Sequence, residues 1–299
     1  MLLVLIHGRQ QQGLNAEEEK AKWLRALHDG MDAIGVSMPL REDDVRFAYY
    51  GDALDRLQHG RPGVEVIIRG EASVEELEAA FSAPLLEQWA DSLSHGAFSS
   101  EVRDESLERN VLGHPRVRRV LQWLNDNWSI AGAASLYWLT RDVYLYLNSA
   151  RVQRAIDQGV EAALARTEPM VVVGHSLGSV VAHSVVSRLQ PADGWQVPLL
   201  VTLGSPLAIR AVRESLASPV YPPVVSEWLN AFDARDVVAL HPLTQQTFPT
   251  DRVIHNHDGV DNASADHHAV DKYLEDPGVA RWLHDALEGL EPPDRPLAP

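Results

Sequence analysis

The sequence feature that most constrains the fold is an apolar run that ends in a Gly-His-Ser-Leu-Gly turn. Residues 169–179 read Pro-Met-Val-Val-Val-Gly-His-Ser-Leu-Gly-Ser, and the chain continues through Val180, Val181 and Val185. A G-x-S-x-G pattern arises by chance roughly 0.07 times in a chain of this composition, and requiring a strand before it and a helix after it lowers that number several-fold. The segment therefore predicts a buried strand, a sharp turn at Ser176 and a helix directly after it.

The two glycines of this turn have a physical reason. Side chains two residues before and after the serine would collide in a tight strand-to-helix turn, and Gly174 and Gly178 remove them. The turn strains the serine backbone, and the helix directs N–H groups and its positive dipole end towards an oxyanion above Ser176. We expect the hydroxyl to be lifted clear of the carboxyl edge of the sheet. An oxygen beneath the protein surface would count against an enzyme.

Five further runs of β-branched or aliphatic residues lie before and after this turn. Most are continuous rather than alternating, which is typical of strands covered on both faces in a parallel sheet. Helical patterns separate them: Asn15 and Glu18 resemble a capping box, and Asp276-Pro277 precedes a last helix over about 278–290. This alternation predicts a doubly wound α/β sheet of about six mostly parallel strands with helices on both faces. The expected strands are Leu2 to Ile6, Val45 to Tyr50, Met170 to Val173, Leu199 to Leu203, Trp228 to Phe232 and, more weakly, Arg252 to His255.

The segment from about residue 52 to 168 interrupts this alternation. It contains little strand pattern apart from Val64 to Ile68, and most of it is typical of helix. Aromatic residues lie along it, and packing of helix against helix explains most of them. We expect one α/β domain over residues 1–290, with 52–168 as a mostly helical insertion or cap. A disordered tail is expected over 291–299, because the sequence EPPDRPLAP is too rich in proline to pack.

Charge and cysteine content exclude several classes of partner and cofactor. The chain has 26 Lys and Arg against 42 Asp and Glu, and its net charge of −16 disfavours nucleic acid and anionic lipid surfaces. It has no cysteine, which excludes disulfides, thiolate metal sites and thiol nucleophiles. The start, MLLVLIHG, lacks a basic segment and is too short for a secretion signal or a membrane span. We expect a cytoplasmic protein without a transmembrane segment.

The turn, with its strand and helix, resembles the nucleophile elbow of the α/β-hydrolase family, in particular of its lipases and esterases. The resemblance implies an α/β-hydrolase fold and a catalytic triad in the chain order serine, acid, histidine, with Ser176 as the nucleophile. For the acid, residues 228–239 resemble the family's strand and turn, in which an Asp precedes a hydrophobic residue. This favours Asp236, followed by Val237, over Asp233, which would then cap the turn.

The same resemblance implies a base and an oxyanion hole. The run Ala-Asp-His-His-Ala-Val-Asp-Lys-Tyr-Leu near the C-terminus resembles the family's histidine loop, in which the catalytic histidine lies a few residues before a Tyr-Leu pair that opens the last helix. The spacing to that pair favours His268, and the neighbouring His267 stays an alternative. The backbone N–H groups of Leu177 and Arg9 are the candidate oxyanion donors, and Gln10 is an alternative to Arg9.

A group of histidines and carboxylates near the C-terminus is a rival site. Four imidazoles and three carboxylates within fourteen residues could bind a divalent metal. Their spacing matches no metal motif, however, and polar surface loops often have such a composition. We therefore expect no metal, and the triad requires no cofactor. The residues of this group are His255, His257, Asp258, Asp261, Asp266, His267 and His268.

These expectations converge on a serine hydrolase. Ser176 would attack an ester carbonyl, His268 would accept its proton and later activate water, and Asp236 would orient the imidazole. Because the aromatic insertion would cover the carboxyl edge of the sheet, we expect a small or lipid-like acyl ester as substrate. Two alternatives stay open: a thioesterase or acyltransferase with the same triad, and a non-catalytic α/β-hydrolase scaffold that binds a ligand or partner.

Overall fold

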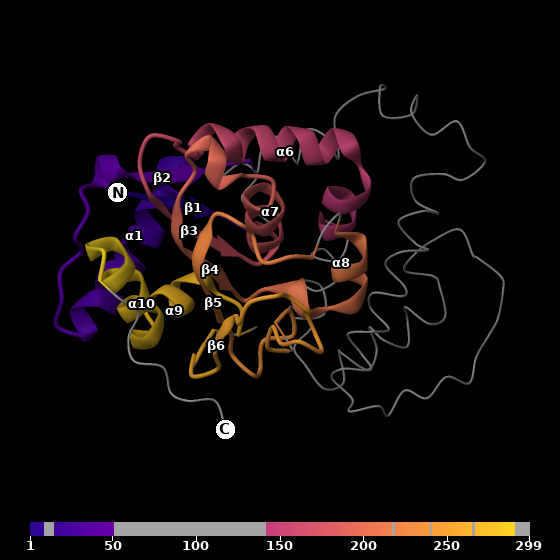
Figure 1. Cartoon of the computed structure of the whole chain (residues 1–299). Helices are drawn as coiled ribbons and strands as arrows, with labels where there is room; N and C mark the ends of the chain where they lie inside the picture. The colour runs from indigo at the N-terminus through magenta and orange to yellow at the C-terminus, as the bar shows by residue number, and fades with distance from the viewer. Residues whose placement is uncertain (9–14, 51–141, 217–218, 240, 265–266, 291–299) are drawn as a thin grey trace, which may run out of the picture.

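A computed structural model of the chain describes residues 1–8, 15–50, 142–216, 219–239, 241–264 and 267–290 (Figure 1). Within these ranges six strands form one sheet in the order β2-β1-β3-β4-β5-β6, and every neighbouring pair is parallel. The predicted parallel α/β sheet of about six strands is thereby confirmed. The strands are β1 (Leu2–Ile6), β2 (Val45–Ala48), β3 (Met170–His175), β4 (Val197–Leu203), β5 (Val225–Ala231) and β6 (His255–His257).

The strands differ from the predicted ranges mainly at their ends. β2 stops at Ala48 instead of Tyr50, and β6 overlaps the predicted range only at His255. Arg252, predicted as strand, lies before β6 with its guanidinium over the Tyr221 ring, 4.0 Å from the ring centroid. The expected strand at 64–68 lies outside the described residues.

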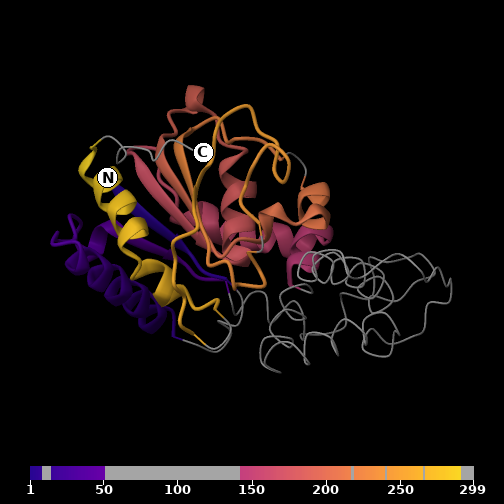
Figure 2. The same cartoon turned by 90° about the horizontal axis from the view of Figure 1, so that it is seen from below.

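Helices cover both faces of the sheet, as Figures 1 and 2 show. Leu3 and Leu5 of β1 belong to the core on one face, whereas Val4 and Ile6 belong to the core on the other. Both sets are buried, which explains why this strand is a continuous apolar run. One layer contains α1 (Ala16–Ala33), α9 (Val270–Leu274) and α10 (Pro277–Glu288), and the other contains α6 (Ala150–Ala163), α7 (Leu177–Val186) and α8 (Arg210–Ser215). Short 3-10 helices are η1 (Glu42–Asp44), η3 (Pro191–Asp193) and η4 (Pro206–Ala208).

Polar side chains cap the predicted first and last helices. Asn15 caps α1, although its side chain accepts from the N–H of Glu17 at 3.0 Å rather than from the third helical residue that a capping box uses. The side chain of Asp276 accepts from the N–H of Val279 at 2.9 Å and caps α10. The Tyr-Leu pair expected to open the last helix instead closes the short helix α9, because α10 begins only at the capped Asp276-Pro277 step.

Part of the expected insertion belongs to a layer of the sheet. Residues 142–148 are helical, and α6 follows them and packs against β2 and α7. Residues 51–141 and the tail 291–299 lie outside the described residues, so the insertion, the tail and the division into domains stay predictions. No helix among the described residues combines the length and apolar character needed to cross a membrane.

The strand order creates a switch point between β1 and β3. The chain leaves β1 to form β2 on one side and later forms β3 on the other side of β1. In parallel α/β sheets, ligands bind at the carboxyl ends of the strands where the order reverses in this way. His7-Gly8 follows β1 at this edge, and Ser176 follows β3.

Candidate active site

Ser176 lies directly between β3 and α7 in a strained conformation. Its φ is 55° and its ψ is −126°, a region that residues other than glycine rarely adopt. Strain of this kind persists only where the surrounding structure enforces it, and it is common at functional sites. The strained turn expected from the sequence is confirmed.

The glycines allow three backbone segments to approach each other at this turn. A Cβ atom on Gly174 would lie 2.5 Å from the carbonyl oxygen of Gly178. One on Gly178 would lie 2.3 Å from the carbonyl oxygen of Ile6, and one on Gly8 would lie 2.9 Å from the Cβ of Ser176. The end of β1 therefore presses directly on the serine turn, which only glycine at these positions permits.

A buried pair of serines supports the turn from below. The hydroxyl of Ser179 donates to the backbone oxygen of Ser176 at 2.5 Å and lies 2.7 Å from the hydroxyl of Ser205. Ser205 also accepts from the N–H of Leu207 and so caps η4, whose first residue is Pro206. Ser205 thus has the structural role that its Gly-Ser-Pro context indicates.

Asp236 and His268 form a hydrogen-bonded pair. The His268 Nδ1 lies 2.7 Å from Oδ2 of Asp236, and the Asp236 side chain is fully buried after the end of β5. The N–H of Val238 donates to the other carboxylate oxygen at 2.9 Å. With its Nδ1 proton donated to the carboxylate, a neutral His268 carries its lone pair on Nε2, the atom that can accept a proton.

The pair also lies against the end of β4. A Cβ atom on Gly204 would lie 3.0 Å from both the Asp236 carboxylate and the His268 ring. Gly204 directly follows Leu203, whose carbonyl accepts from the backbone N–H of Ser176 at 3.0 Å. The carboxyl ends of β3, β4 and β5 therefore bring the serine turn and the imidazole–carboxylate pair to one edge of the sheet.

Tyr273 is a positioning residue that sequence reasoning missed. Its hydroxyl donates to Oδ2 of Asp236 at 2.5 Å and accepts from the N–H of Asp233 at 3.3 Å. Burial, followed by the charge of Asp236, raises the pKa of the Tyr273 hydroxyl well above its ordinary value, so the hydroxyl stays a donor. In the sequence, this tyrosine serves only to measure the spacing to the candidate catalytic histidine, because the neighbouring residues do not indicate which partner its hydroxyl binds.

The two alternative candidates, Asp233 and His267, face other partners. Asp233 accepts from the N–H of Arg235 at 2.7 Å and forms an ion pair with its guanidinium at 2.7 Å. Burial acts to raise the pKa of Asp233, but hydrogen bonds from Arg235 and Asn262 lower it. His267 has a φ of 55°, and its Nδ1 lies 2.6 Å from the carbonyl oxygen of Asn262. The structure therefore brings Asp236, not Asp233, to the side chain of His268.

A buried asparagine, also missed from sequence, joins the acid turn to the histidine loop. The N–H of Asn262 donates to Asp233 at 2.7 Å, and its side-chain amide donates to the carbonyl of Ala269 at 2.9 Å. Its side-chain oxygen accepts from the hydroxyl of Ser264 at 2.5 Å. The loop before His268 is thus fixed at both ends, which no short motif in the sequence indicates.

The serine hydroxyl is not exposed as expected. Ser176 is 2% exposed, and its Oγ makes no hydrogen bond to the described residues, His268 included. This burial contradicts the expectation of an accessible hydroxyl at the sheet edge. Of the oxyanion candidates, Leu177 is the first residue of α7, where N–H groups lack helical acceptors. Arg9 and its alternative Gln10 lie outside the described residues.

His7, at the end of β1, is a neutral structural residue. Its Nδ1 lies 2.5 Å from the carbonyl oxygen of Gly8, and its Nε2 accepts from the N–H of Tyr50 at 2.9 Å. Burial lowers the pKa of His7 to about 4. The ring therefore fixes the loop after β1 to the end of β2 and carries no charge at neutral pH.

The histidines of the rival metal site bind separate partners. His255 lies 3.0 Å from Glu227, and His257 lies 2.7 Å from Asp276. Within the described part of the chain, no three His, Cys, Asp or Glu side chains gather in a way that could hold a metal. Asp266, one of the carboxylates in that group, lies outside the described residues.

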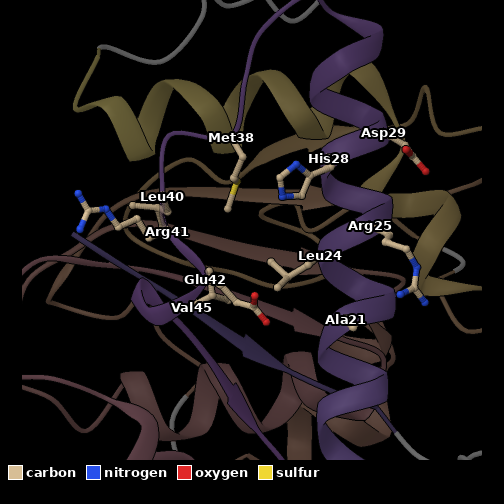
Figure 3. A pocket seen from close by; sticks show the side chains of 10 residues that line it. All are labelled: Ala21, Leu24, Arg25, His28, Asp29, Met38, Leu40, Arg41, Glu42 and Val45. Carbon is tan, nitrogen blue, oxygen red and sulfur yellow. The ribbon is translucent and has the colours of Figure 1, made fainter.

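A cavity of about 300 Å³ lies away from the serine turn (Figure 3). It lies between α1 and the segment that leads into β2, and its lining includes Leu24, Met38 and Leu40. In Figure 3 the guanidinium groups of Arg25 and Arg41 point away from each other, so they do not converge on a common ligand. None of the triad candidates lines this cavity.

No protein-family model, curated protein or solved structure matches the chain. The feature of the molecule that bears on function is therefore the geometry at the carboxyl edge of the sheet. That geometry combines a strained serine at the start of a helix with a partly buried imidazole paired to a fully buried carboxylate.

Proposed function

We propose that the chain is a serine hydrolase of the α/β-hydrolase type, with Ser176 as nucleophile, His268 as base and Asp236 as acid. The observation that carries the proposal is the pair of His268 with the fully buried Asp236, which shares one sheet edge with the strained Ser176 turn. The three residues also follow the chain order that such triads use on this type of scaffold. A carboxylate on Nδ1 orients the ring so that Nε2 can take the serine proton.

The proposed reaction proceeds in two steps. Nε2 of His268 accepts the Ser176 proton as the oxygen attacks the ester carbonyl, and the alcohol leaves with that proton. Water then attacks the acyl-enzyme and its proton passes to the same nitrogen; as the bond between the acyl carbon and Oγ breaks, that proton returns to Ser176 and the acid is released. Asp236 stabilises the imidazolium in both steps. Hydrogen bonds between nucleophile and base commonly tighten only when substrate binds, which accords with the absent Ser176–His268 bond.

Charge on the reacting carbonyl oxygen requires donors at the same edge. We assign this role to the backbone N–H of Leu177, at the positive end of α7, and to that of Arg9 after β1. Each such donor contributes on the order of 10²-fold to kcat in comparable hydrolases.

The proposed substrate is a carboxylic ester with an apolar acyl group. This choice follows from the aromatic sequence over residues 52–168, which would supply an apolar pocket above the sheet edge. Thioester hydrolysis and acyl transfer use the same triad and differ only in leaving group or acceptor.

One observation favours a second candidate, a non-catalytic scaffold. Ser176 is 2% exposed, so a substrate reaches the hydroxyl only if the protein over the turn moves. A non-catalytic scaffold requires no access to this hydroxyl and therefore no such movement. Activity measurements decide between the enzyme and the scaffold.

A series of p-nitrophenyl esters from acetate to palmitate tests the proposal, with wild type and Ser176→Ala compared under identical conditions. We expect turnover by wild type that rises beyond acetate and falls at least 10³-fold in the variant. Acyl thioesters and alcohol acceptors, added in parallel, identify the favoured leaving group and acceptor. Preference for acetate over all longer chains would contradict the apolar substrate, and equal rates for both proteins would contradict the enzyme.

A further inference from the structure

His175, the residue before the serine, makes a contact that the triad does not explain. Its Nε2 lies 3.0 Å from the backbone carbonyl oxygen of His268. Because the acceptor is a carbonyl, the ring must carry its proton on Nε2 and donate it. The centroids of the two imidazole rings lie 4.6 Å apart with 36° between their planes. The side chain of the second residue of the Gly-His-Ser-Leu-Gly turn thus binds the backbone of the candidate base.

The His175 side chain is itself held in place. It is 8% exposed, and its backbone pairs with Leu203 in the β3–β4 register. The ring of Trp23 meets its ring edge-on at 6.3 Å between centroids, and the ring of Tyr273 lies 5.9 Å away. A donor on a central strand, surrounded by aromatic rings, defines a fixed point for the loop that it binds.

The protonation state of His175 does not change near neutral pH, so its ring can donate this hydrogen bond throughout that range. Burial lowers its pKa well below the ordinary value, and a positive charge on His268, when that ring is protonated, acts in the same direction, while the bond to the His268 carbonyl opposes them. The ring is therefore neutral at neutral pH and adds no charge beside the base. Its contribution is geometric.

We propose that His175 is a positioning residue that fixes His268 relative to Ser176. The bond joins the residue next to the nucleophile to the residue that carries the base, so the two reacting groups share one anchor. Asp236 orients the His268 ring, whereas His175 fixes its backbone. The distance between serine oxygen and imidazole nitrogen limits the rate of proton transfer, and a misplacement of about 1 Å costs roughly 10²-fold. This assignment rests on the serine hydrolase proposed above.

Two substitutions separate the hydrogen bond from packing. His175→Phe keeps a flat ring and removes the donor, and His175→Gln keeps an amide N–H near the place of Nε2–H. His183→Phe is the matched control, because His183 is also buried and its Nε2 lies 2.8 Å from the carbonyl oxygen of Val220 on another loop. All variants are compared in the full chain at a temperature at which circular dichroism shows them folded.

The first measurement is ¹H–¹⁵N NMR of the His268 Nδ1 proton, which lies in the bond to Asp236. We expect this proton to exchange with solvent at least tenfold faster in His175→Phe, and at nearly the wild-type rate in His175→Gln and His183→Phe. Unchanged exchange in the Phe variant would overturn the proposal. If that variant does not fold, loss of the protected proton in a folded Gln variant would overturn it equally.

The second measurement is the rate at which a fluorophosphonate modifies Ser176, followed between pH 5 and 9. We expect His175→Phe to lower this rate roughly 10- to 100-fold and to change its pH profile, with His175→Gln and His183→Phe close to wild type. Equal rates in the Phe variant and wild type would contradict the positioning role. Wild type that does not react at all would instead overturn the serine hydrolase, and the NMR comparison would then decide the role of His175 alone.

Discussion

Two histidine–aspartate pairs lie in the C-terminal third of the chain with the same separation and different surroundings. His268 and Asp236 approach to 2.7 Å, and so do His257 and Asp276. The carboxylate of Asp236 is fully buried and that of Asp276 is 9% exposed, while the imidazoles of His268 and His257 are 16% and 29% exposed. A short distance between an imidazole and a carboxylate therefore does not identify a catalytic pair.

The atoms that take part explain the difference. His268 uses Nδ1 towards its carboxylate and keeps Nε2 for another proton, whereas His257 uses Nε2 and its carboxylate caps α10. Burial acts to raise the pKa of Asp276, but the bonds from His257 and the N–H of Val279 lower it. The first pair lies beside a strained serine, and the second fastens a helix end. We therefore expect one to control activity and the other to control stability.

The largest expected effect is on turnover when the buried carboxylate is neutralised. Asp236→Asn removes the charge that orients His268 and stabilises its protonated form, and we expect kcat to fall by about 10³- to 10⁴-fold. Ester hydrolysis under saturating substrate measures this. Asp276→Asn and Asp233→Asn serve as controls, and each should keep kcat within about tenfold of wild type. A large loss in Asp233→Asn with little loss in Asp236→Asn would reassign the acid.

Two other histidines, His7 and His183, are buried and bind backbone groups instead of a carboxylate, and we expect them to affect the stability of the protein in acid. Burial lowers the pKa of both His7 and His183 to about 4. The unfolded chain takes up these protons from about pH 6.5 downward, while the folded chain does so only near pH 4, so stability falls across this window as pH decreases. Each group contributes at most about 3 kcal/mol to the fall in the free energy of unfolding.

Urea unfolding at intervals from pH 7.5 to 4.5 measures this fall. His183→Leu should flatten the curve by the share of one histidine. A curve of unchanged slope in that variant would show that His183 takes up its proton at the same pH in the folded and the unfolded chain, which would contradict the lowered pKa.

A smaller effect on turnover is expected from the hydroxyl that supports the catalytic pair. Tyr273→Phe keeps the buried ring and removes one hydrogen bond to Asp236. We expect kcat to fall roughly tenfold, which corresponds to about 1.4 kcal/mol and is the usual size of a bond to a charged group. The pH profile of kcat is recorded for both proteins as well, because Tyr273 contacts the carboxylate that pairs with His268. Identical kcat and pH profiles in the two proteins would leave Tyr273 with packing as its only role.

The smallest effect belongs to the second pair. Asp276→Ala removes the cap of α10 and the partner of His257, and we expect it to lower the free energy of unfolding by about 1 kcal/mol. Urea unfolding at pH 7 measures the loss, and kcat should stay unchanged. A fall in kcat as large as that of Asp236→Asn would remove the distinction between the two pairs.

Local patterns in the sequence are sufficient to predict the sheet. β1 and β3 are fully buried and follow apolar runs of the sequence, whereas the edge strand β6 is partly exposed and shares only His255 with its predicted range. The glycines around Ser176 indicate a turn that only glycine permits. The ends of strands are less predictable. Arg252, for example, lies before β6 because its side chain contacts the ring of Tyr221, which is distant in the sequence.

The residue types of the site can be predicted from the sequence, but the hydrogen bonds and ion pairs between them cannot. Asp233 and Asp236 share one turn, and the choice between them depends on Arg235 beside them and on Asn262, which the chain brings back from another loop. Burial of Ser176 could not be predicted either, because the exposure of a side chain depends on the tertiary structure and not on the local turn motif.

The most direct test is whether Ser176 reacts as a nucleophile. Folded wild type and Ser176→Ala are treated with a fluorophosphonate at pH 7.5, and the adduct is located by peptide mass spectrometry. We expect one adduct on Ser176 in wild type and none in the variant. We also expect the adduct to form faster as the temperature is raised towards, but not into, the unfolding transition, because protein motion then admits the probe. Folded wild type that stays unmodified over this whole range would contradict the enzyme and leave a buried, unused serine on an α/β scaffold.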